Sequence, residues 1–477
     1  MKPAEIIDRD AEWRTLETMW RKDRPQLVFV LGRRRVGKSF VLARFARAVG
    51  GLYYQATRRT EPEQLAHLSR IVGDRFDDGV LKQGVPFPSW EALLGYLTER
   101  ARSEPLLVVL DELPYLVGAT PALPSILQSA WDHDWAGSRL KVVLSGSFVS
   151  AMRALEGADQ PLYGRRTARL ALGPFAFQEA TGFMPSYAPL DQLTAYGLFG
   201  NLPGHLALID PALSVAENAS AALLDPSGPL VDDAQHMLDA FVGDGRVHYS
   251  ILEAIATGDR TWSGIARRVG QSGGSLQRPL RWLEEMGLVQ RVAPITDKDP
   301  RRSKRALHRI TDPYITLWHG RIAPLLHAGS IGLVEPRRLW DESVSVRLSE
   351  HLGPVFEEAC REFVRRGEGL PIWPLRVGEW WDSDSRDQVD VVAVDGDGRV
   401  LVAECKWGEV THHDLRSLRS RAARVAAELD GRGEPILALF SARDEADSAV
   451  REAVSAGDVL YFVARDLATQ HELRAVP

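Results

Sequence analysis

The sequence predicts an α/β fold built in several parts, and three observations carry this prediction. A short apolar run, QLVFVL at 26–31, leads through a glycine-rich loop into a helical pattern. The stretch 250–310 contains three short helical patterns followed by a β-like run, and 389–406 contains two β-rich runs around the letters DGDG. At 477 residues the chain is long enough for roughly three domains.

The composition is that of a globular protein in a reducing compartment. Hydrophobic residues make up 45% and charged residues 26%, which excludes an intrinsically disordered chain. The two cysteines, Cys360 and Cys405, are too few for a disulfide framework. The charged opening MKPAEIIDRDAEWR lacks a signal-peptide core, and no run reaches about 18 apolar residues. We therefore expect a cytoplasmic protein without a membrane segment.

The first part of the chain contains a phosphate-binding loop. Gly32, Gly37, Lys38 and Ser39 match G-x-x-x-x-G-K-[ST], with a strand-like run before them and a helical pattern after them. The glycines let backbone N–H groups surround phosphates, Lys38 reaches the outer phosphates, and Ser39 can bind Mg²⁺. The sequence thus predicts ATP and Mg²⁺ as cofactors. The predicted nucleotide contacts are Gly32, Arg33, Arg34, Arg35, Val36, Gly37, Lys38, Ser39 and Phe40.

A second apolar run supplies the acidic residues that such a loop needs. PLLVVLDELPYLV ends its apolar part in Asp111 and Glu112, the placement of a metal-assisting carboxylate followed by a general base. In the next run, LKVVLSGSFVSAM, Ser145 is predicted to sense the γ-phosphate. The alternative for this polar end is that Ser147 caps a helix, since serine is a preferred cap.

Two arginines follow that run. Arg165 and Arg166 in PLYGRRTARLALGPF are candidates for an arginine finger, a guanidinium that reaches a phosphate, often from a neighbouring subunit. That role would imply a homo-oligomer. The alternative is an arginine pair that contacts no phosphate.

These motifs together resemble a known family. The combination LGRRRVGKS, LDELPYL, LSGS, LYGRRT and LFGNLPGHL is similar to the AAA-like P-loop ATPases of archaea and bacteria, which are related to origin-recognition ATPases. The resemblance implies a P-loop NTPase core followed by a helical lid. It gives the roles above to the phosphate loop, Asp111, Glu112, Ser145 and one of Arg165 and Arg166.

The middle of the chain predicts a winged helix. Three groups of apolar residues recur at helical spacing between 251 and 283, Thr261 is a plausible cap, and residues 287–310 would form the wing. From Thr261 to Ile310 eleven Lys and Arg residues stand against four acids, a net +7 in a chain of net charge −6. We expect this patch to contact the phosphate backbone of DNA; packing against the ATPase part or another protein is the alternative.

The run around DGDG predicts a β-hairpin that brings acidic residues together. Glu404 and Lys406 are two residues apart and so share one strand face. If the hairpin is centred on residue 397, Asp390 lies opposite Glu404; a two-residue loop would break this register. Two carboxylates beside a lysine suit Mg²⁺ and the activation of a water molecule.

The hairpin also resembles a family, the PD-(D/E)xK nucleases, and more narrowly the DUF234-type domain fused to such ATPases. The segment GPVFEEAC is similar to the GxxFE helix of that domain, which implies Glu357 as a further catalytic acid. The resemblance then implies Glu357, Asp390, Glu404 and Lys406 as catalytic residues, with Asp390 and Glu404 as metal ligands beside the Ser39 and Asp111 of the first site.

The whole chain is therefore expected to have four parts. They are a P-loop ATPase core at 1–175, a helical lid at 176–235, a winged helix at 236–325, and a small α/β, restriction-endonuclease-like domain at 326–477. The expected function is ATP hydrolysis coupled to DNA engagement, with a Mg²⁺-dependent nuclease-like domain. The alternative is a regulatory NTPase switch or transcription regulator whose last domain binds without cutting.

Overall fold

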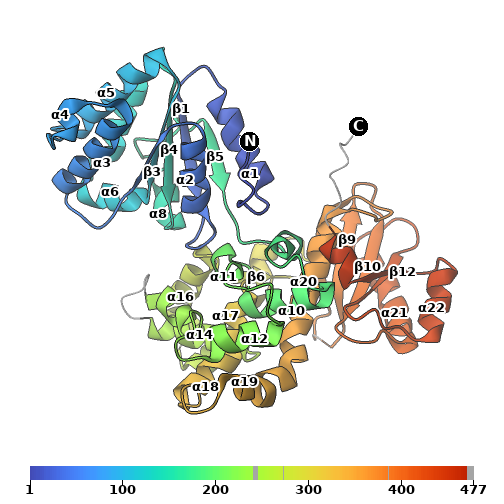
Figure 1. Cartoon of the computed structure of the whole chain (residues 1–477). Helices are drawn as coiled ribbons and strands as arrows, with labels where there is room; N and C mark the ends of the chain where they lie inside the picture. The colour runs from blue at the N-terminus through green and yellow to red at the C-terminus, as the bar shows by residue number, and fades with distance from the viewer. Residues whose placement is uncertain (240–244, 272, 385, 470–477) are drawn as a thin grey trace. The chain divides into compact units, whose positions relative to one another are not determined.

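The computed structural model describes residues 1–239, 245–271, 273–384 and 386–469, and it divides into two compact units (Figure 1). The first unit is Met1–Pro174 and the second is Phe175–Pro477. Their division falls beside the predicted boundary at 175. The finer division of the second unit into lid, winged helix and C-terminal domain stays a prediction.

The first unit is a five-stranded parallel sheet between helices, as the apolar runs predict. Its strand order is β2-β3-β4-β1-β5. Every residue of β1, β3 and β4 is buried, because a parallel sheet covered by helices on both faces excludes water from both sides. The strands are β1 (Gln26–Leu31), β2 (Leu52–Gln55), β3 (Leu106–Asp111), β4 (Leu140–Gly146) and β5 (Ala168–Ala171).

Helices cover both faces of this sheet. Leucines and a tryptophan of α3, α5 and α7 form one hydrophobic cluster with alternate residues of the strands, while Figure 1 shows α1 and α2 on the other side. The helices are α1 (Asp10–Trp20), α2 (Lys38–Ala48), α3 (Glu61–Phe76), α4 (Gly79–Lys82), α5 (Trp90–Ser103), α6 (Leu113–Ala119), α7 (Leu123–Ser129) and α8 (Val149–Ala154). The loop edge of the sheet, where β1, β3 and β4 end, therefore gathers the predicted nucleotide residues.

The second unit begins with short helices and continues as three helices and an antiparallel hairpin, the order of elements that the sequence predicts. Thr261 accepts a hydrogen bond from the N–H of Gly264 at 3.0 Å and so caps α15 as expected. The elements are α9 (Phe177–Ala180), α10 (Pro189–Phe199), α11 (Pro203–Leu206), α12 (Val215–Ala219), α13 (Asp233–Asp239), α14 (Arg246–Ala256), α15 (Trp262–Val269), α16 (Gly273–Glu285), β6 (Val289–Val292), β7 (Leu307–Ile310), α17 (Pro313–Leu317), α18 (Ala323–His327) and α19 (Pro336–Leu339).

The rest of this unit is a mixed five-stranded sheet of order β12-β11-β10-β9-β8. The strands β8, β9 and β10 are antiparallel, whereas β10, β11 and β12 are parallel. Helix α20 covers one face, and α21 with α22 covers the other. The elements are α20 (Leu348–Arg366), β8 (Pro374–Trp381), β9 (Gln388–Asp395), β10 (Val400–Lys406), α21 (His412–Glu428), β11 (Ile436–Ser441), α22 (Ser448–Ser455), β12 (Leu460–Val463) and α23 (Ala464–Ala468).

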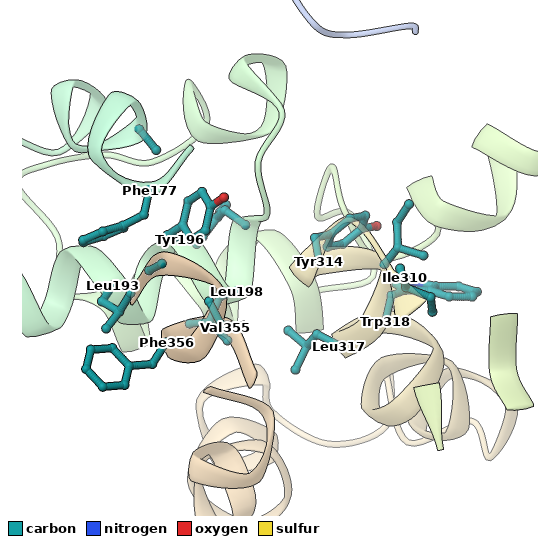
Figure 2. Packing of buried hydrophobic residues seen from close by; sticks show 14 of the residues in the cluster. Phe177, Leu193, Tyr196, Leu198, Ile310, Tyr314, Leu317, Trp318, Val355 and Phe356 are labelled. Carbon is teal, nitrogen blue, oxygen red and sulfur yellow. The ribbon is translucent and has the colours of Figure 1, made fainter. Parts of the chain in front are cut away.

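One hydrophobic cluster runs through the whole second unit. It joins Tyr196 of α10 and Trp318, just after α17, to Phe356 of α20 and continues to the sheet (Figure 2). Polar contacts follow the same path: Asn201 donates a hydrogen bond to the carbonyl of Thr311 at 2.8 Å. The predicted lid, winged helix and C-terminal segments are therefore packed on one another. Across the described part of the chain, no helix is both long and apolar enough to cross a membrane.

Candidate functional site

The phosphate loop has the backbone that its glycines predict. A Cβ on Gly32 would lie 2.5 Å from the carbonyl oxygen of Leu172, so only glycine fits there. Gly37 has φ 87° and Arg35 has φ 67°, both in the left-handed region. Such a loop turns backbone N–H groups inward at the start of α2, which suits an anion. In this loop and the start of α2, Arg33 and Val36 are buried, Arg34 is half-buried, and Arg35 and Phe40 are exposed.

Lys38 lies inside this loop rather than in solvent. Its ammonium donates hydrogen bonds to the carbonyls of Gly32 at 2.7 Å and Arg33 at 3.1 Å, and to the hydroxyl of Ser147 at 2.9 Å. Burial lowers the pKa of Lys38, and Glu112 and Asp111 oppose this effect. The ammonium therefore stands where outer phosphates can replace the loop carbonyls as its acceptors.

Asp111 is fully buried at the end of β3, and three donors hold its carboxylate. Oδ2 accepts from the Ser39 hydroxyl at 2.5 Å and the Tyr53 hydroxyl at 2.7 Å, and Oδ1 accepts from the Glu112 N–H at 3.0 Å. Burial raises the pKa of Tyr53, and the charge of Asp111 raises it further. The sequence predicted the approach of Ser39 and Asp111 but missed Tyr53, because no local pattern links β2 to β3.

Glu112 faces the same space from a constrained backbone. Its φ is 55° and its ψ is 46°, a left-handed conformation that costs a non-glycine residue energy and is often found at functional sites. The carboxylate accepts hydrogen bonds from the N–H of Ser147 at 3.2 Å and from its hydroxyl at 2.5 Å. Ser147 thus joins Glu112 to Lys38.

The structure separates the roles of the two predicted serines. Ser145 is buried on β4, and its hydroxyl has no hydrogen-bond partner among the described residues. Ser147, one residue beyond β4, contacts both Lys38 and Glu112. The alternative interpretation of Ser147 as a helix cap is wrong, because Phe148 occupies the position before α8 and Ser147 is used by the nucleotide site. A sensor role for Ser145 stays a prediction.

Arg165 and Arg166 each pair with a carboxylate of their own unit. The Arg165 guanidinium donates to both oxygens of Asp132, at 2.9 and 2.7 Å, and Arg166 forms an ion pair with Glu156. A finger role for Arg165 requires that this bidentate pair be broken, so the assignment of either arginine as a finger stays a prediction.

The hairpin of the second unit has the predicted register. Ala403 pairs with Val391 and Val400 with Val394, so the next position along the ladder sets Asp390 opposite Glu404. A β-bulge modifies this site: Trp380 pairs with Val389 and Gly378 with Val392, so β9 has one residue more than β8 there. Asp390 lies in that bulge, and its Oδ2 accepts the N–H of Cys405 at 2.9 Å.

The carboxylates of the second site lie close enough to repel one another. Burial raises the pKa of Asp390 to about 7, and the charges of Glu357 and Glu404 add to this effect. Burial also raises the pKa of Glu357, against the nearby Arg361. The sequence-predicted set of Glu357, Asp390, Glu404 and Lys406 is therefore one electrostatic group on α20, β9 and β10.

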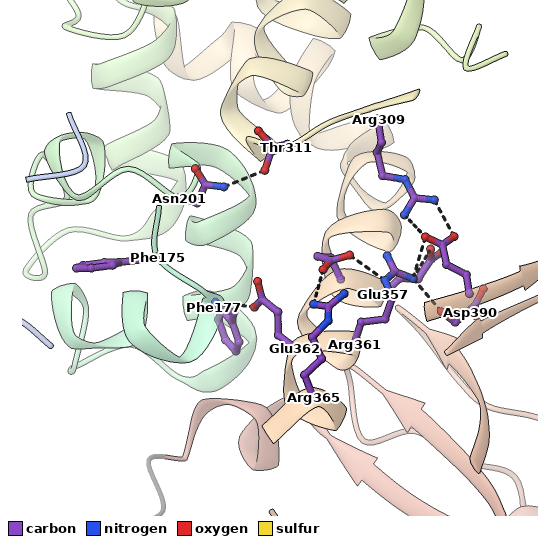
Figure 3. Close-up of polar contacts among 12 residues, drawn as sticks. Phe175, Phe177, Asn201, Arg309, Thr311, Glu357, Arg361, Glu362, Arg365 and Asp390 are labelled. Carbon is purple, nitrogen blue, oxygen red and sulfur yellow. Dashed lines mark hydrogen bonds and ion pairs between the residues drawn. The ribbon is translucent and has the colours of Figure 1, made fainter. Parts of the chain in front are cut away.

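Cations from the chain itself neutralise this group. Glu404 accepts hydrogen bonds from Lys406 at 2.8 Å and from Arg421 of α21 at 3.0 Å. The fully buried Arg361 donates to Glu358 at 2.8 Å and to the carbonyl of Asp390 at 2.8 Å, as Figure 3 shows. Within the described ranges, no group of three or more His, Cys, Asp or Glu side chains is arranged to hold a metal ion.

Sequence reasoning missed these arginines. Arg361 stands four residues after Glu357, a helical spacing that could have indicated their contact at 3.9 Å. Arg309 of β7 pairs with Glu379 of β8 through two hydrogen bonds of 2.6 and 2.8 Å, and no sequence signal predicts this pair. A metal at Asp390 and Glu404 stays a prediction.

The first prediction concerns binding and hydrolysis of ATP. Lys38→Ala should weaken ATP binding by about tenfold or more, because a charge-assisted contact to the phosphates is lost. Glu112→Gln should bind ATP normally and hydrolyse it about 10² to 10⁴ times more slowly. Equilibrium binding and steady-state hydrolysis measure the two effects, with exposed Lys82→Ala as the control. Normal turnover in both variants would refute these roles.

The second prediction separates the two serines. Ser147→Ala should lower kcat for ATP by about tenfold or more, because Glu112 and Lys38 lose a shared partner. Ser145→Ala should change kcat by less than about twofold, since its hydroxyl makes no bond that the substitution removes. Steady-state ATP hydrolysis checks both, and a larger loss in Ser145→Ala would reverse the assignment.

Comparison with known proteins agrees with this geometry. Residues 6–209 match a family described as an ATPase domain predominantly from Archaea, and residues 327–418 match DUF234, archaeal and bacterial proteins of unknown function. An uncharacterized protein of Methanocaldococcus jannaschii is 24% identical over 420 residues, covering 87% of this chain and 90% of that protein.

Solved structures share the fold. A Walker-type ATPase of Pyrococcus abyssi matches with a TM-score of 0.52 and 20% identity over 67% of this chain and 97% of that one. The ORC2 protein of Aeropyrum pernix, solved as ADPNP–ADP complexes, gives a TM-score of 0.46 and 15% identity over 70% of this chain and 97% of that one. The chain is thus a P-loop ATPase with an archaeal-type ATPase domain at 6–209 and a DUF234 domain at 327–418.

Proposed function

We propose that this ATPase uses Mg²⁺–ATP and couples its nucleotide state to the engagement of DNA by the second unit. The observation that carries the DNA proposal is the net charge of +7 between Thr261 and Ile310 in a chain of net charge −6. Such a patch attracts a phosphate backbone without reading its sequence. The nucleotide-binding residues and the cationic segment belong to different units, so each can be tested alone.

The nucleotide site supports the following division of roles. Lys38 holds the outer phosphates, and Glu112 orients the attacking water and takes its proton, held in place by Ser147. Ser39 and Asp111 fit Mg²⁺, since they offer adjacent hard oxygen atoms, 2.5 Å apart, beside the loop. When bound, this ion would neutralise charge on the phosphates.

The cations of the segment 261–310 fall into two groups. Three of them serve internal contacts: Arg291 donates to the Pro300 and Ser303 carbonyls, Arg305 pairs with Asp297, and Arg309 pairs with Glu379. The others are exposed: Arg267, Arg268, Arg278, Arg281, Lys298, Arg301, Arg302 and Lys304. The exposed set supports DNA contact, and the internal set holds the hairpin against β8.

The third prediction tests DNA contact. Replacing Arg301, Arg302 and Lys304 together with Gln should weaken DNA binding and lower its salt dependence by up to about 2.7, at about 0.9 per phosphate contact. Binding measured at several salt concentrations gives this slope. The control replaces Arg337, Arg338 and Arg347 with Gln, which removes the same charge elsewhere in the unit. Equal slopes in the two triple variants would contradict the proposal.

A second candidate function is phosphodiester cleavage at the Asp390 site. Its support is the grouping of Asp390, Glu404 and Lys406 with Glu357, together with the raised pKa of Asp390. Two carboxylates suffice for a Mg²⁺ ion that keeps most of its water, so Asp390 and Glu404 fit as ligands, with Lys406 beside them. The alternative is a domain that binds without cutting, in which Lys406 and Arg421 permanently neutralise Glu404.

The fourth prediction separates these alternatives. If the domain cleaves DNA, Asp390→Asn and Glu404→Gln should each abolish Mg²⁺-dependent cleavage of single-stranded, duplex or branched DNA, because each removes a ligand charge. Both variants should hydrolyse ATP at the wild-type rate, since the ATP site lies in the other unit. The control is Asp395→Asn, at the far end of β9. Cleavage that survives both substitutions would exclude this site as its source.

A further inference from the structure

Tyr53 lies at the loop edge of the first sheet, on the strand next to the one that carries Asp111. In the parallel pair of β2 and β3, Tyr53 aligns with Val109 and Gln55 aligns with Asp111. The long tyrosine side chain spans this offset, so its hydroxyl lies 2.7 Å from Oδ2 of Asp111. The contact joins residues 58 positions apart in the sequence.

Two hydroxyls share the same carboxylate oxygen, but their surroundings differ. Ser39 is the second residue of α2 and belongs to the phosphate loop, whereas Tyr53 belongs to a strand of the sheet. A serine hydroxyl that binds a metal ion uses its oxygen lone pair toward the ion. A phenol is a hydrogen-bond donor at neutral pH, so Tyr53 can keep donating to Asp111 throughout a catalytic cycle.

We propose that Tyr53 is a positioning residue for ATP hydrolysis, which fixes the Asp111 carboxylate for the Mg²⁺-bound nucleotide. The inference rests on the proposed Mg²⁺ at Ser39 and Asp111. Partners that orient a metal ligand commonly change metal affinity by about 10- to 100-fold when they are removed. Loss of the Tyr53 hydroxyl therefore acts on the Mg²⁺-dependent part of nucleotide binding and leaves the phosphate loop itself unchanged.

The neighbouring Tyr54 provides a matched control. It is 1% exposed, lies on the opposite face of β2, and donates its hydroxyl to the Gln64 side chain. Its ring belongs to the hydrophobic cluster under α3, away from the nucleotide loop. Both Tyr53→Phe and Tyr54→Phe remove one hydroxyl from β2, but only the first removes a contact to Asp111.

The experiment measures the affinity for a fluorescent, non-hydrolysable ATP analogue, first in EDTA and then across a Mg²⁺ titration. Tyr53→Phe should bind the analogue in EDTA within about twofold of the wild-type value. The Mg²⁺ concentration for half-maximal enhancement should rise by about tenfold or more. Tyr54→Phe should titrate like the wild type, and melting curves of both variants report any general loss of folding.

Three outcomes would overturn the inference. A wild-type Mg²⁺ titration in Tyr53→Phe would show that Asp111 needs no such partner. An equal loss of affinity in EDTA and in Mg²⁺, or a shift of the same size in Tyr54→Phe, would show a structural effect on β2. Absence of any Mg²⁺ effect in the wild-type protein would overturn both the proposed metal and the role of Tyr53.

Discussion

A carboxylate removed from water must be given hydrogen-bond donors or a cation, and this requirement shapes both candidate sites. Asp111 is fully buried and receives three donors, one each from the phosphate loop, β2 and its own following residue. Asp390 is nearly as buried but receives the N–H of Cys405 beside two other acids. The first carboxylate is therefore stabilised as an anion, whereas the second is poised near neutrality.

The second unit is organised around one buried guanidinium. Arg361 binds the backbone carbonyl of Asp390 and the Glu358 side chain, and its Nη1 lies 3.9 Å from an oxygen of Glu379. Glu379 in turn pairs with Arg309 of the hairpin. Removing one member of such a network leaves an uncompensated buried charge, which typically costs about 3–5 kcal/mol. The helix that carries Glu357 thereby ties the acidic group to the cationic hairpin.

This network also limits what the hairpin can do. Ile295 donates its N–H to the carbonyl of Glu379 at 2.8 Å, and the Trp381 indole donates to the carbonyl of Arg305 at 3.3 Å. One side of the hairpin is thus packed on β8, and only cations on its remaining surface can meet a partner. Both interpretations of the cationic segment, packing and phosphate contact, therefore apply to different residues of it.

The sequence alone determined the first site in outline and the register of the second. The spacing of Gly32, Gly37 and Lys38 is local, and the glycine-rich turn sets Asp390 opposite Glu404 because strand pairing follows from the turn. Burial in β1, β3 and β4 was likewise predictable, since continuous apolar runs suit strands covered on both faces.

Only the tertiary structure decided which side chains complete the sites. Ser147 rather than Ser145 meets Lys38, Tyr53 reaches Asp111 across 58 residues, and Arg421 of α21 meets Glu404. The bulge that turns Asp390 toward β10 also has no sequence signal, because it arises from how β8 fits against β9. A motif constrains neighbours along the chain, whereas these partners are set by the order in which strands and helices pack.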